Sequence, residues 1–215
     1  VAEFLGKIRY IHIVPQLVRE TGRMISRQDD PYGTDFLEQL ASTPERTRNS
    51  RLRRIEKALR VAVPQLKELK LERDDRGVPH LKGLYEHWRP NACWQSEEQF
   101  SDGTLRLLGL LWALLEGESP LLLEEPELSL HVEVIRHIPA MISRAGTKRS
   151  RQVLISTHSP DLLSDEGIAP EEVILLVPTR DGTEIRCAAD DVNVKAMYEA
   201  GLNMADAVMP RTAPP

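Results

Sequence analysis

The sequence predicts an α/β fold with a mainly parallel sheet, flanking helices, and an inserted helix and β-hairpin. Leu121–Leu123 is a short apolar run that stops at two carboxylates, which is typical of a buried strand in a parallel sheet. Arg151–Ser156 predicts a second buried strand after an amphipathic stretch. Residues 121–156 therefore predict a β-α-β unit with parallel strands and a right-handed crossover. Residues 44–85 carry a helical pattern and then a hairpin pattern, which predicts the insertion.

The segment before the insertion predicts one strand and two short helices. Ile8–Val14 alternates and is rich in β-branched residues, as strands are. Gln16 lies just past this strand, and Arg19 follows on the first short helix. Gln28–Gly33 is a turn cluster, after which Thr34 or Asp35 can cap a helix to about residue 41.

The stretch 44–62 predicts a basic amphipathic helix, with Pro44 at its first position. Its apolar stripe consists of Leu52, Ile55, Leu59 and Ala62. Between residues 44 and 60, six arginines and Lys57 stand against two glutamates. This gives a local charge of +5 in a chain whose total is −5. Such a helix suits either a solvated face or contact with nucleic-acid phosphates.

Hairpin patterns occur twice. Leu66–Glu72 and Pro79–Tyr85 flank a turn in which Gly77 supplies a positive φ. Glu172–Val177 and Thr183–Ala188 form the second pair. The intervening Trp88–Trp94 is predicted to be an irregular linker.

Three further helices are predicted in the rest of the chain. Thr104–Glu116 is apolar nearly all round, so we expect a buried helix, capped by Ser101 or Asp102. Leu128–Arg144 is amphipathic, and Pro139 should kink it. A last helix is expected from about residue 190 to 200, before a frayed tail.

Composition sets broad limits on the protein. The chain has 215 residues, 41% hydrophobic and 28% charged, which fits one large globular domain or one with an insertion. Aromatic residues make up only 5%, which argues against a base-stacking surface. Cys93 and Cys187 are interpreted as free thiols in a reducing cytoplasm. No apolar run in the sequence is long enough for a membrane span, and the start does not resemble a secretory signal.

Three motifs follow one another in the second half of the chain. They are Ser101-Asp-Gly103 before the apolar helix, Glu124-Glu-Pro-Glu127 after the first strand, and Ser156-Thr-His-Ser-Pro160 after the second. Their order and spacing resemble the C-terminal half of an ABC-type ATPase, a P-loop NTPase. The residues of the last two motifs are most similar to those of the SMC/RecF/OLD-like branch of stand-alone ATPases.

The resemblance implies a role for each motif. Glu124 would bind Mg²⁺, Glu125 would orient or activate the attacking water, and His158 would contact the γ-phosphate of ATP. Glu127–His131 takes the place of the D-loop. Glu124 departs from the family pattern, in which Asp is usual.

The resemblance also implies three cofactor-binding residues, Ser101, Gly103 and Gln16. Ser101 and Gly103 belong to the signature-like turn, which in the family faces the nucleotide of a second subunit. Asp102 stands where many ABC proteins have Gly, so its side chain is expected to turn away from the phosphate. Gln16 stands where the Q-loop glutamine would be, near Mg²⁺.

The phosphate cradle is missing from these residues. A P-loop requires G-x-x-x-x-G-K-[ST], and the one Gly-Lys pair, Gly6-Lys7, fits it at neither end. We expect the cradle to lie N-terminal to Val1 or on another chain. The 215 residues alone should then hydrolyse ATP poorly.

The organisation predicted is an ATPase-core segment over residues 1–43, the basic helix and hairpin insertion over 44–95, and the signature, Walker B and switch-histidine half over 96–215. The function predicted is ATP hydrolysis in a DNA-linked process, repair or defence, with ATP-dependent homodimerisation. Two alternatives stay open: a structural or regulatory module that uses no nucleotide, and a metal-dependent nuclease built on the acids of the 124–127 motif. Mg-ATP binding separates the first from these, and metal-dependent DNA cleavage without ATP favours the nuclease.

Overall fold

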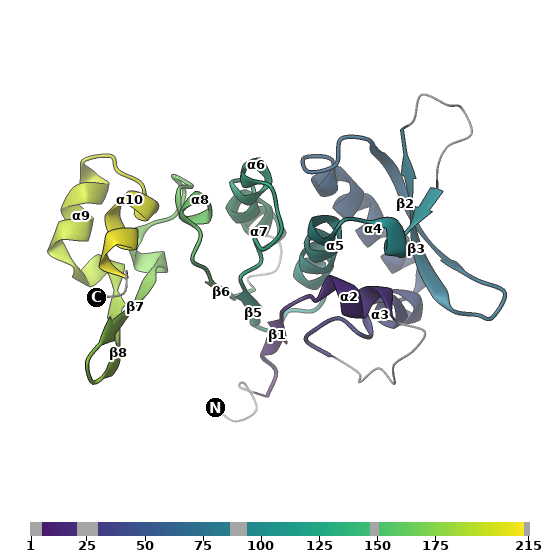
Figure 1. Ribbon diagram of the computed structural model, residues 1–215, viewed down its shortest axis with the longest axis horizontal. Helices are drawn as coiled ribbons and strands as arrows, with labels where there is room; N and C mark the ends of the chain where they lie inside the picture. The colour runs from purple at the N-terminus through teal and green to yellow at the C-terminus, as the bar shows by residue number, and fades with distance from the viewer. Residues whose placement is uncertain (1–5, 21–29, 87–93, 147–150, 213–215) are drawn as a thin grey trace. The chain divides into compact units, whose positions relative to one another are not determined.

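The computed structural model describes residues 6–20, 30–86, 94–146 and 151–212. The chain divides into two compact units (Figure 1). The first unit comprises residues 1–131 and 141–157, and the second comprises residues 132–140 and 158–215.

The first unit is built around a parallel sheet of three strands in the order β1-β5-β6. These strands are β1 (Arg9–Ile11), β5 (Leu121–Glu124) and β6 (Val153–Ser156). β5 pairs in parallel with both neighbours, so the predicted parallel sheet is confirmed. β1 is shorter than the predicted strand. β6 is only half-buried, with Leu154 41% exposed, so the prediction of a second buried strand was wrong.

Helix α5 (Asp102–Leu115) forms the core of this unit. Every residue of α5 except Asp102 and Arg106 is buried, as its apolar sequence predicts. Three further helices belong to the same unit, α2 (Pro15–Arg19), α3 (Phe36–Ser42) and α4 (Glu45–Leu59). All three occur close to where the sequence predicts them.

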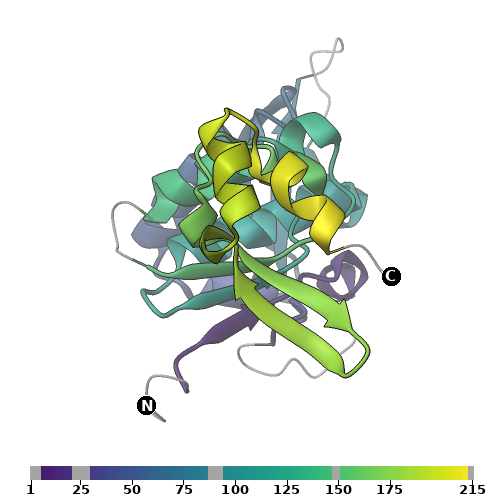
Figure 2. The same ribbon diagram turned by 90° about the vertical axis from the view of Figure 1, so that its left-hand side faces the viewer.

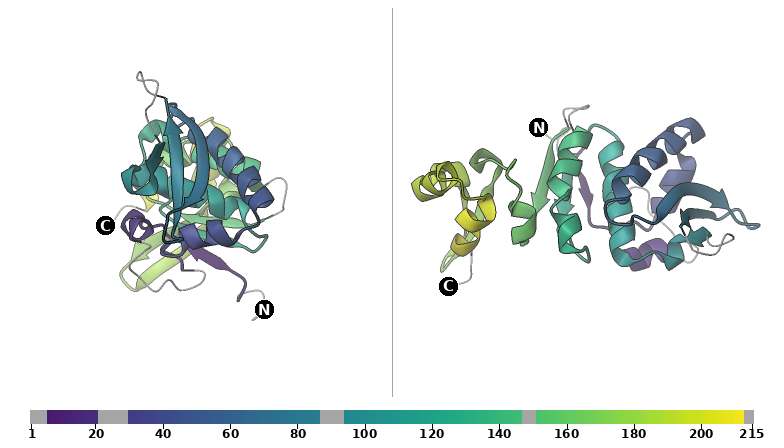
Figure 3. Two further views of the ribbon diagram at one scale, coloured as in Figure 1. Left: turned by 90° about the vertical axis from the view of Figure 1, so that its right-hand side faces the viewer. Right: turned by 90° about the horizontal axis from the view of Figure 1, so that it is seen from above.

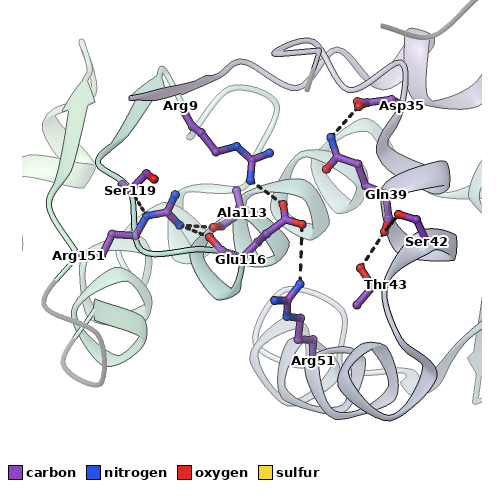
Figure 4. Close-up of polar contacts among 10 residues, drawn as sticks. All are labelled: Arg9, Asp35, Gln39, Ser42, Thr43, Arg51, Ala113, Glu116, Ser119 and Arg151. Atoms are coloured by element: carbon purple, nitrogen blue, oxygen red, sulfur yellow. Dashed lines mark hydrogen bonds and ion pairs between the residues drawn. The ribbon is translucent and has the colours of Figure 1, made fainter. Parts of the chain in front are cut away.

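A network of polar contacts ties the C-terminal end of α5 to the starting ends of the strands (Figure 4). Glu116 accepts a hydrogen bond from Arg9 at 2.7 Å and lies 3.8 Å from Arg51, whose guanidinium sits 5.0 Å from the Trp112 ring centroid. Arg151 donates to three carbonyl oxygens, those of Ala113, Glu116 and Ser119. Because the last carbonyls of a helix lack intrahelical donors, Arg151 caps α5.

The insertion forms an antiparallel sheet of β2 (Leu66–Arg73), β3 (Pro79–Tyr85) and β4 (Trp94–Ser96), followed by the 3₁₀ turn η1 (Glu97–Gln99). Helix α4 packs on this sheet (Figure 3). The predicted hairpin is confirmed, with Gly77 at φ 82°. The predicted linker Trp88–Trp94 falls outside the described residues except for Trp94, which begins β4 and pairs with β3.

The predicted single helix over Leu128–Arg144 was wrong. Two short helices occur instead, α6 (Val132–Ile135) and α7 (Ile138–Gly146). Pro139 is the second residue of α7, where the missing N–H is harmless, so it starts a helix rather than kinking one. Residues 125–130 form turns, with hydrogen bonds from Leu128 N to Glu125 O and from Leu130 N to Glu127 O.

The second unit has its own small core. After α8 (Pro160–Leu163) and η2 (Pro170–Glu172), β7 (Ile174–Thr179) and β8 (Gly182–Cys187) form the second predicted hairpin. Turn η3 (Ala188–Asp190), helices α9 (Val192–Glu199) and α10 (Met204–Val208), and turn η4 (Met209–Arg211) complete it (Figure 2). The core residues are Val173, Leu175, Ala188, Val194, Met204, Ala207 and Val208. Within the described ranges, no helix has the length and apolarity that crossing a bilayer requires.

Candidate functional site

Glu124 is the last residue of the central strand β5, at the carboxyl end of the parallel sheet, where ligands of α/β folds bind. Its side chain is 48% exposed, and His12 Nδ1 lies 3.9 Å from its carboxylate. The Tyr10 hydroxyl, on the neighbouring strand β1, donates a hydrogen bond to the same carboxylate. This hydrogen bond raises the pKa of Tyr10 to about 12, since ionised Tyr10 would lose the bond and repel Glu124.

Glu125 leaves the strand geometry. Its φ is 40°, which is uncommon for a residue with a side chain. Its N–H still bonds Ser156 O at 2.9 Å, so the backbone stays attached to β6 while the chain turns. In a regular strand two adjacent side chains point to opposite faces. Glu124 and Glu125 nevertheless both line one small pocket, together with Arg106, Leu110 and Pro126.

Glu127, the third acid of the motif, is only 8% exposed. Thr157, just after β6, donates a hydrogen bond to its carboxylate, and Glu127 Oε2 has no hydrogen-bond partner among the described residues. Glu127 therefore joins the turn after β5 to the end of β6, which is a structural position. Groups of three or more His, Cys, Asp or Glu able to hold a metal do not occur in the described part of the chain.

The signature-like turn packs against the turn after β5. Ser101 is the N-cap of α5, with its hydroxyl accepting from Thr104 N at 3.2 Å, so Ser101 rather than Asp102 caps the helix. A Cβ on Gly103 would lie 2.6 Å from the carbonyl oxygen of Ser129, which itself has φ 64°. This close approach is a structural reason for glycine at position 103, independent of any nucleotide.

Gln16 and Asp102, 86 residues apart, are brought together. Gln16 Nε2 donates to the Asp102 carboxylate at 3.3 Å, and Arg19 donates to it at 2.7 Å. Arg19 also donates to Phe100 O at 2.7 Å. Helix α2 is thus fastened to the start of α5. Sequence reasoning missed Arg19 as a partner of Asp102, because nothing in either segment identifies the other.

His158 is an exposed residue of the second unit, two residues after β6. It belongs to a different unit from Glu125, so its predicted role at the γ-phosphate stays a prediction. Tyr10 and Arg106 were not predicted as site residues. Tyr10 alternates with apolar neighbours in a predicted strand, but its approach to Glu124 depends on the order of the strands.

The arrangement of these carboxylates suits a Mg²⁺ ion, which takes few protein ligands, better than a metal ion whose ligands all come from the protein. Mg²⁺ usually takes one or two carboxylates and completes its octahedron with water and substrate phosphates. The exposed carboxylate of Glu124 can serve as such a ligand. The residues present do not supply a phosphate cradle, because the P-loop motif is absent from the sequence.

A parallel sheet whose central strand ends in two carboxylates, flanked by helices, has the fold of a P-loop NTPase core. Residues 16–164 match the family described as "AAA domain, putative AbiEii toxin, Type IV TA system", and the chain belongs to this AAA-domain family of ATPases. No curated protein sequence matches significantly.

Solved structures of SMC ATPases have the same fold. One, from work on ATP-driven dimerization and DNA-stimulated activation of SMC ATPases, aligns with a TM-score of 0.50 and 10% identity, over 78% of this chain and 96% of that chain. Another is the Smc head domain of Pyrococcus furiosus, with an extended coiled coil, bound to the C-terminal domain of ScpA. It aligns with a TM-score of 0.51 and 14% identity, over 72% of this chain, which spans 38% of the other. These likenesses establish the fold as ABC/SMC-like.

Proposed function

We propose that this chain is the Walker B and signature part of an ABC/SMC-like ATPase that binds and hydrolyses Mg-ATP. Glu124 binds Mg²⁺, and Glu125 orients or activates the attacking water. The observation that carries this proposal is the pair of adjacent glutamates at the end of β5, Glu124 and Glu125, which both line one pocket. Membership of the ATPase family supports it.

The experiment that tests this function is Mg²⁺-dependent ATP hydrolysis. We call this chain together with the segment that supplies its phosphate cradle the complete ATPase. The complete ATPase should turn over ATP and lose activity when EDTA removes Mg²⁺, whereas the 215 residues alone should stay near background. Robust turnover by the 215 residues alone, or none by the complete ATPase, would contradict the proposal.

We also propose the domain organisation that the sequence predicts. Residues 1–43 and 96–215 form the ATPase core, and residues 44–95 form an insertion. Gln16 is the metal-facing residue of the first segment. Its contact with Asp102 would have to loosen for Gln16 to reach a metal ion. ATP-dependent homodimerisation through Ser101 and Gly103 completes the proposal, and a structural neighbour studied for ATP-driven dimerization supports it.

DNA is the partner that the insertion suits, through part of its basic helix. Arg48, Arg51 and Arg60 are occupied by contacts within the protein. The exposed cations of α4 that no ion pair holds among the described residues are Arg46, Arg53, Arg54 and Lys57. Arg46, Arg53 and Lys57 follow helical spacing, so they lie on one face. We call these four residues the basic stripe.

Reversing the basic stripe to Glu should weaken DNA binding by the complete ATPase at least about tenfold at low salt, since each lost phosphate contact reduces counterion release. The salt dependence of binding should also become shallower. Fluorescence anisotropy with a labelled duplex over a range of salt concentrations measures both. The matched control is Arg60→Gln, which removes a cation that already pairs with Glu56. Equal affinity of the stripe variant and the control would show that α4 is only a solvated face.

A further inference from the structure

We infer that Arg106 is a phosphate-binding residue of this site, which contacts the terminal phosphate of the nucleotide held beside Glu124 and Glu125. The inference rests on the proposed function and adds to it a residue outside the motifs. Arg106 is in the second turn of α5, one of only two residues of that helix that are not buried. Arg106 lines the same pocket as Glu124 and Glu125.

Arg106 differs from three other arginines of the first unit in its bonds, although Arg19 and Arg151 also each keep one buried nitrogen without a hydrogen-bond partner. Arg9, Arg19 and Arg151 each donate hydrogen bonds to named oxygen atoms. Arg106 Nε is buried and has no hydrogen-bond partner among the described residues. No carboxylate of the described chain lies within ion-pair distance of its guanidinium, although Glu125 is one of its neighbours. The guanidinium of Arg106 is therefore available to bind an anion that this chain does not itself supply.

The surroundings of Arg106 favour an oxyanion as that partner. Burial lowers the pKa of its guanidinium, and the nearby charges of Asp102 and Glu125 only partly oppose this. Asp102 accepts hydrogen bonds from Arg19 and Gln16 and forms its ion pair with Arg19, not with Arg106. The planar guanidinium fork matches phosphate oxygens geometrically. A phosphate bound beside this pocket would be near both Arg106 and Glu124, the residue that would hold the metal ion.

The position of the pocket beside Glu125 indicates which phosphate of the nucleotide Arg106 would contact. Glu125 is the residue proposed to orient water for attack on the γ-phosphate, and Arg106 shares its pocket. Arg106 should therefore distinguish a nucleoside triphosphate from a diphosphate. A residue that only supports the fold would affect both nucleotides alike.

Binding of two nucleotides to the complete ATPase tests the inference. The probes are ADP and the imido analogue of ATP, adenosine 5′-(β,γ-imido)triphosphate, each with Mg²⁺, in isothermal titration calorimetry. Arg106→Gln should weaken binding of the ATP analogue about tenfold or more and change ADP binding less than about twofold. Arg106→Lys, which keeps the charge but loses the fork, should fall between wild type and Gln. Arg180→Gln, an exposed arginine in the β7–β8 turn, is the matched control.

Each other result overturns the inference. Unchanged analogue binding by Arg106→Gln would show that the guanidinium does not touch the nucleotide. An equal loss for ADP and the analogue, with a lowered melting temperature, would show a structural role instead. If wild-type protein binds neither nucleotide, the proposed ATPase function fails together with the inference, which separates that failure from the first two.

Discussion

Replacing Glu125 by Gln in the complete ATPase is expected to lower ATP turnover by about a hundredfold or more and to trap an ATP-bound dimer. A positioned general base typically contributes about 10²–10⁴-fold to a rate, and Gln cannot accept the proton of the attacking water. Gln has nearly the same shape as Glu. The N–H of residue 125 keeps its bond to Ser156 O, so the turn after β5 should persist.

Sedimentation velocity with and without Mg-ATP measures the trapped state, and a coupled assay measures turnover. If ATP favours the closed dimer and hydrolysis releases it, the Glu125→Gln protein should sediment as a dimer only when ATP is present. The matched control is Glu118→Gln, at an exposed residue in the turn before β5. A Glu125→Gln protein that stays monomeric in saturating Mg-ATP would contradict the proposed ATP-dependent dimerisation.

The second large effect is expected at Ser101. Ser101→Asp should prevent ATP-dependent dimerisation while leaving the fold intact. Asp is as good an N-cap as Ser, so the bond to Thr104 N can be replaced and the melting temperature should change little. The added carboxylate would face the nucleotide of the second subunit, and like charges brought together at an interface cost several kcal/mol, on the order of 3.

Ser101→Asn supplies the control, because it also caps the helix but carries no charge. Comparing the two variants in the Glu125→Gln background isolates the charge from the cap. Dimerisation should survive in Ser101→Asn and disappear in Ser101→Asp. If both variants dimerise equally with ATP, the signature-like turn does not face a nucleotide across the interface.

The parallel sheet and the buried helix were predictable because the sequences of β5 and α5 are almost entirely apolar. Leu121–Leu123 has no polar residue before the acids, and α5 is apolar nearly all round, with Asp102 and Arg106 as its charged residues, so both were expected to be buried. Both hairpins were predictable from their turn residues. Helix 128–144 was not, because an apolar pattern of helical period also fits two short helices broken by a turn, and the left-handed residue Ser129 carries no sequence signal.

The candidate site was predictable where one stretch of chain carries it and unpredictable where two stretches meet. Glu124 and Glu125 are identified by the strand that they end. Tyr10 reaches Glu124 from β1, a strand more than a hundred residues away, and only the order of strands makes them neighbours. The same holds for Gly103. Glycine is required there because the carbonyl oxygen of Ser129 leaves no room for a Cβ atom.

The pairing of β1 with β5 has a consequence for how the first unit folds. Arg9 pairs with Leu121, and the whole α4 and β2–β3 insertion lies between them in the chain. Hairpin β2–β3 closes a short loop, which happens on a microsecond scale, about 1–10 μs. Closing the long loop between β1 and β5 costs more conformational entropy. This cost arises before the contacts between the two strands can stabilise the closed loop. The insertion should therefore form early, and the strands that carry the acids should assemble last, with the site complete only once the unit has folded.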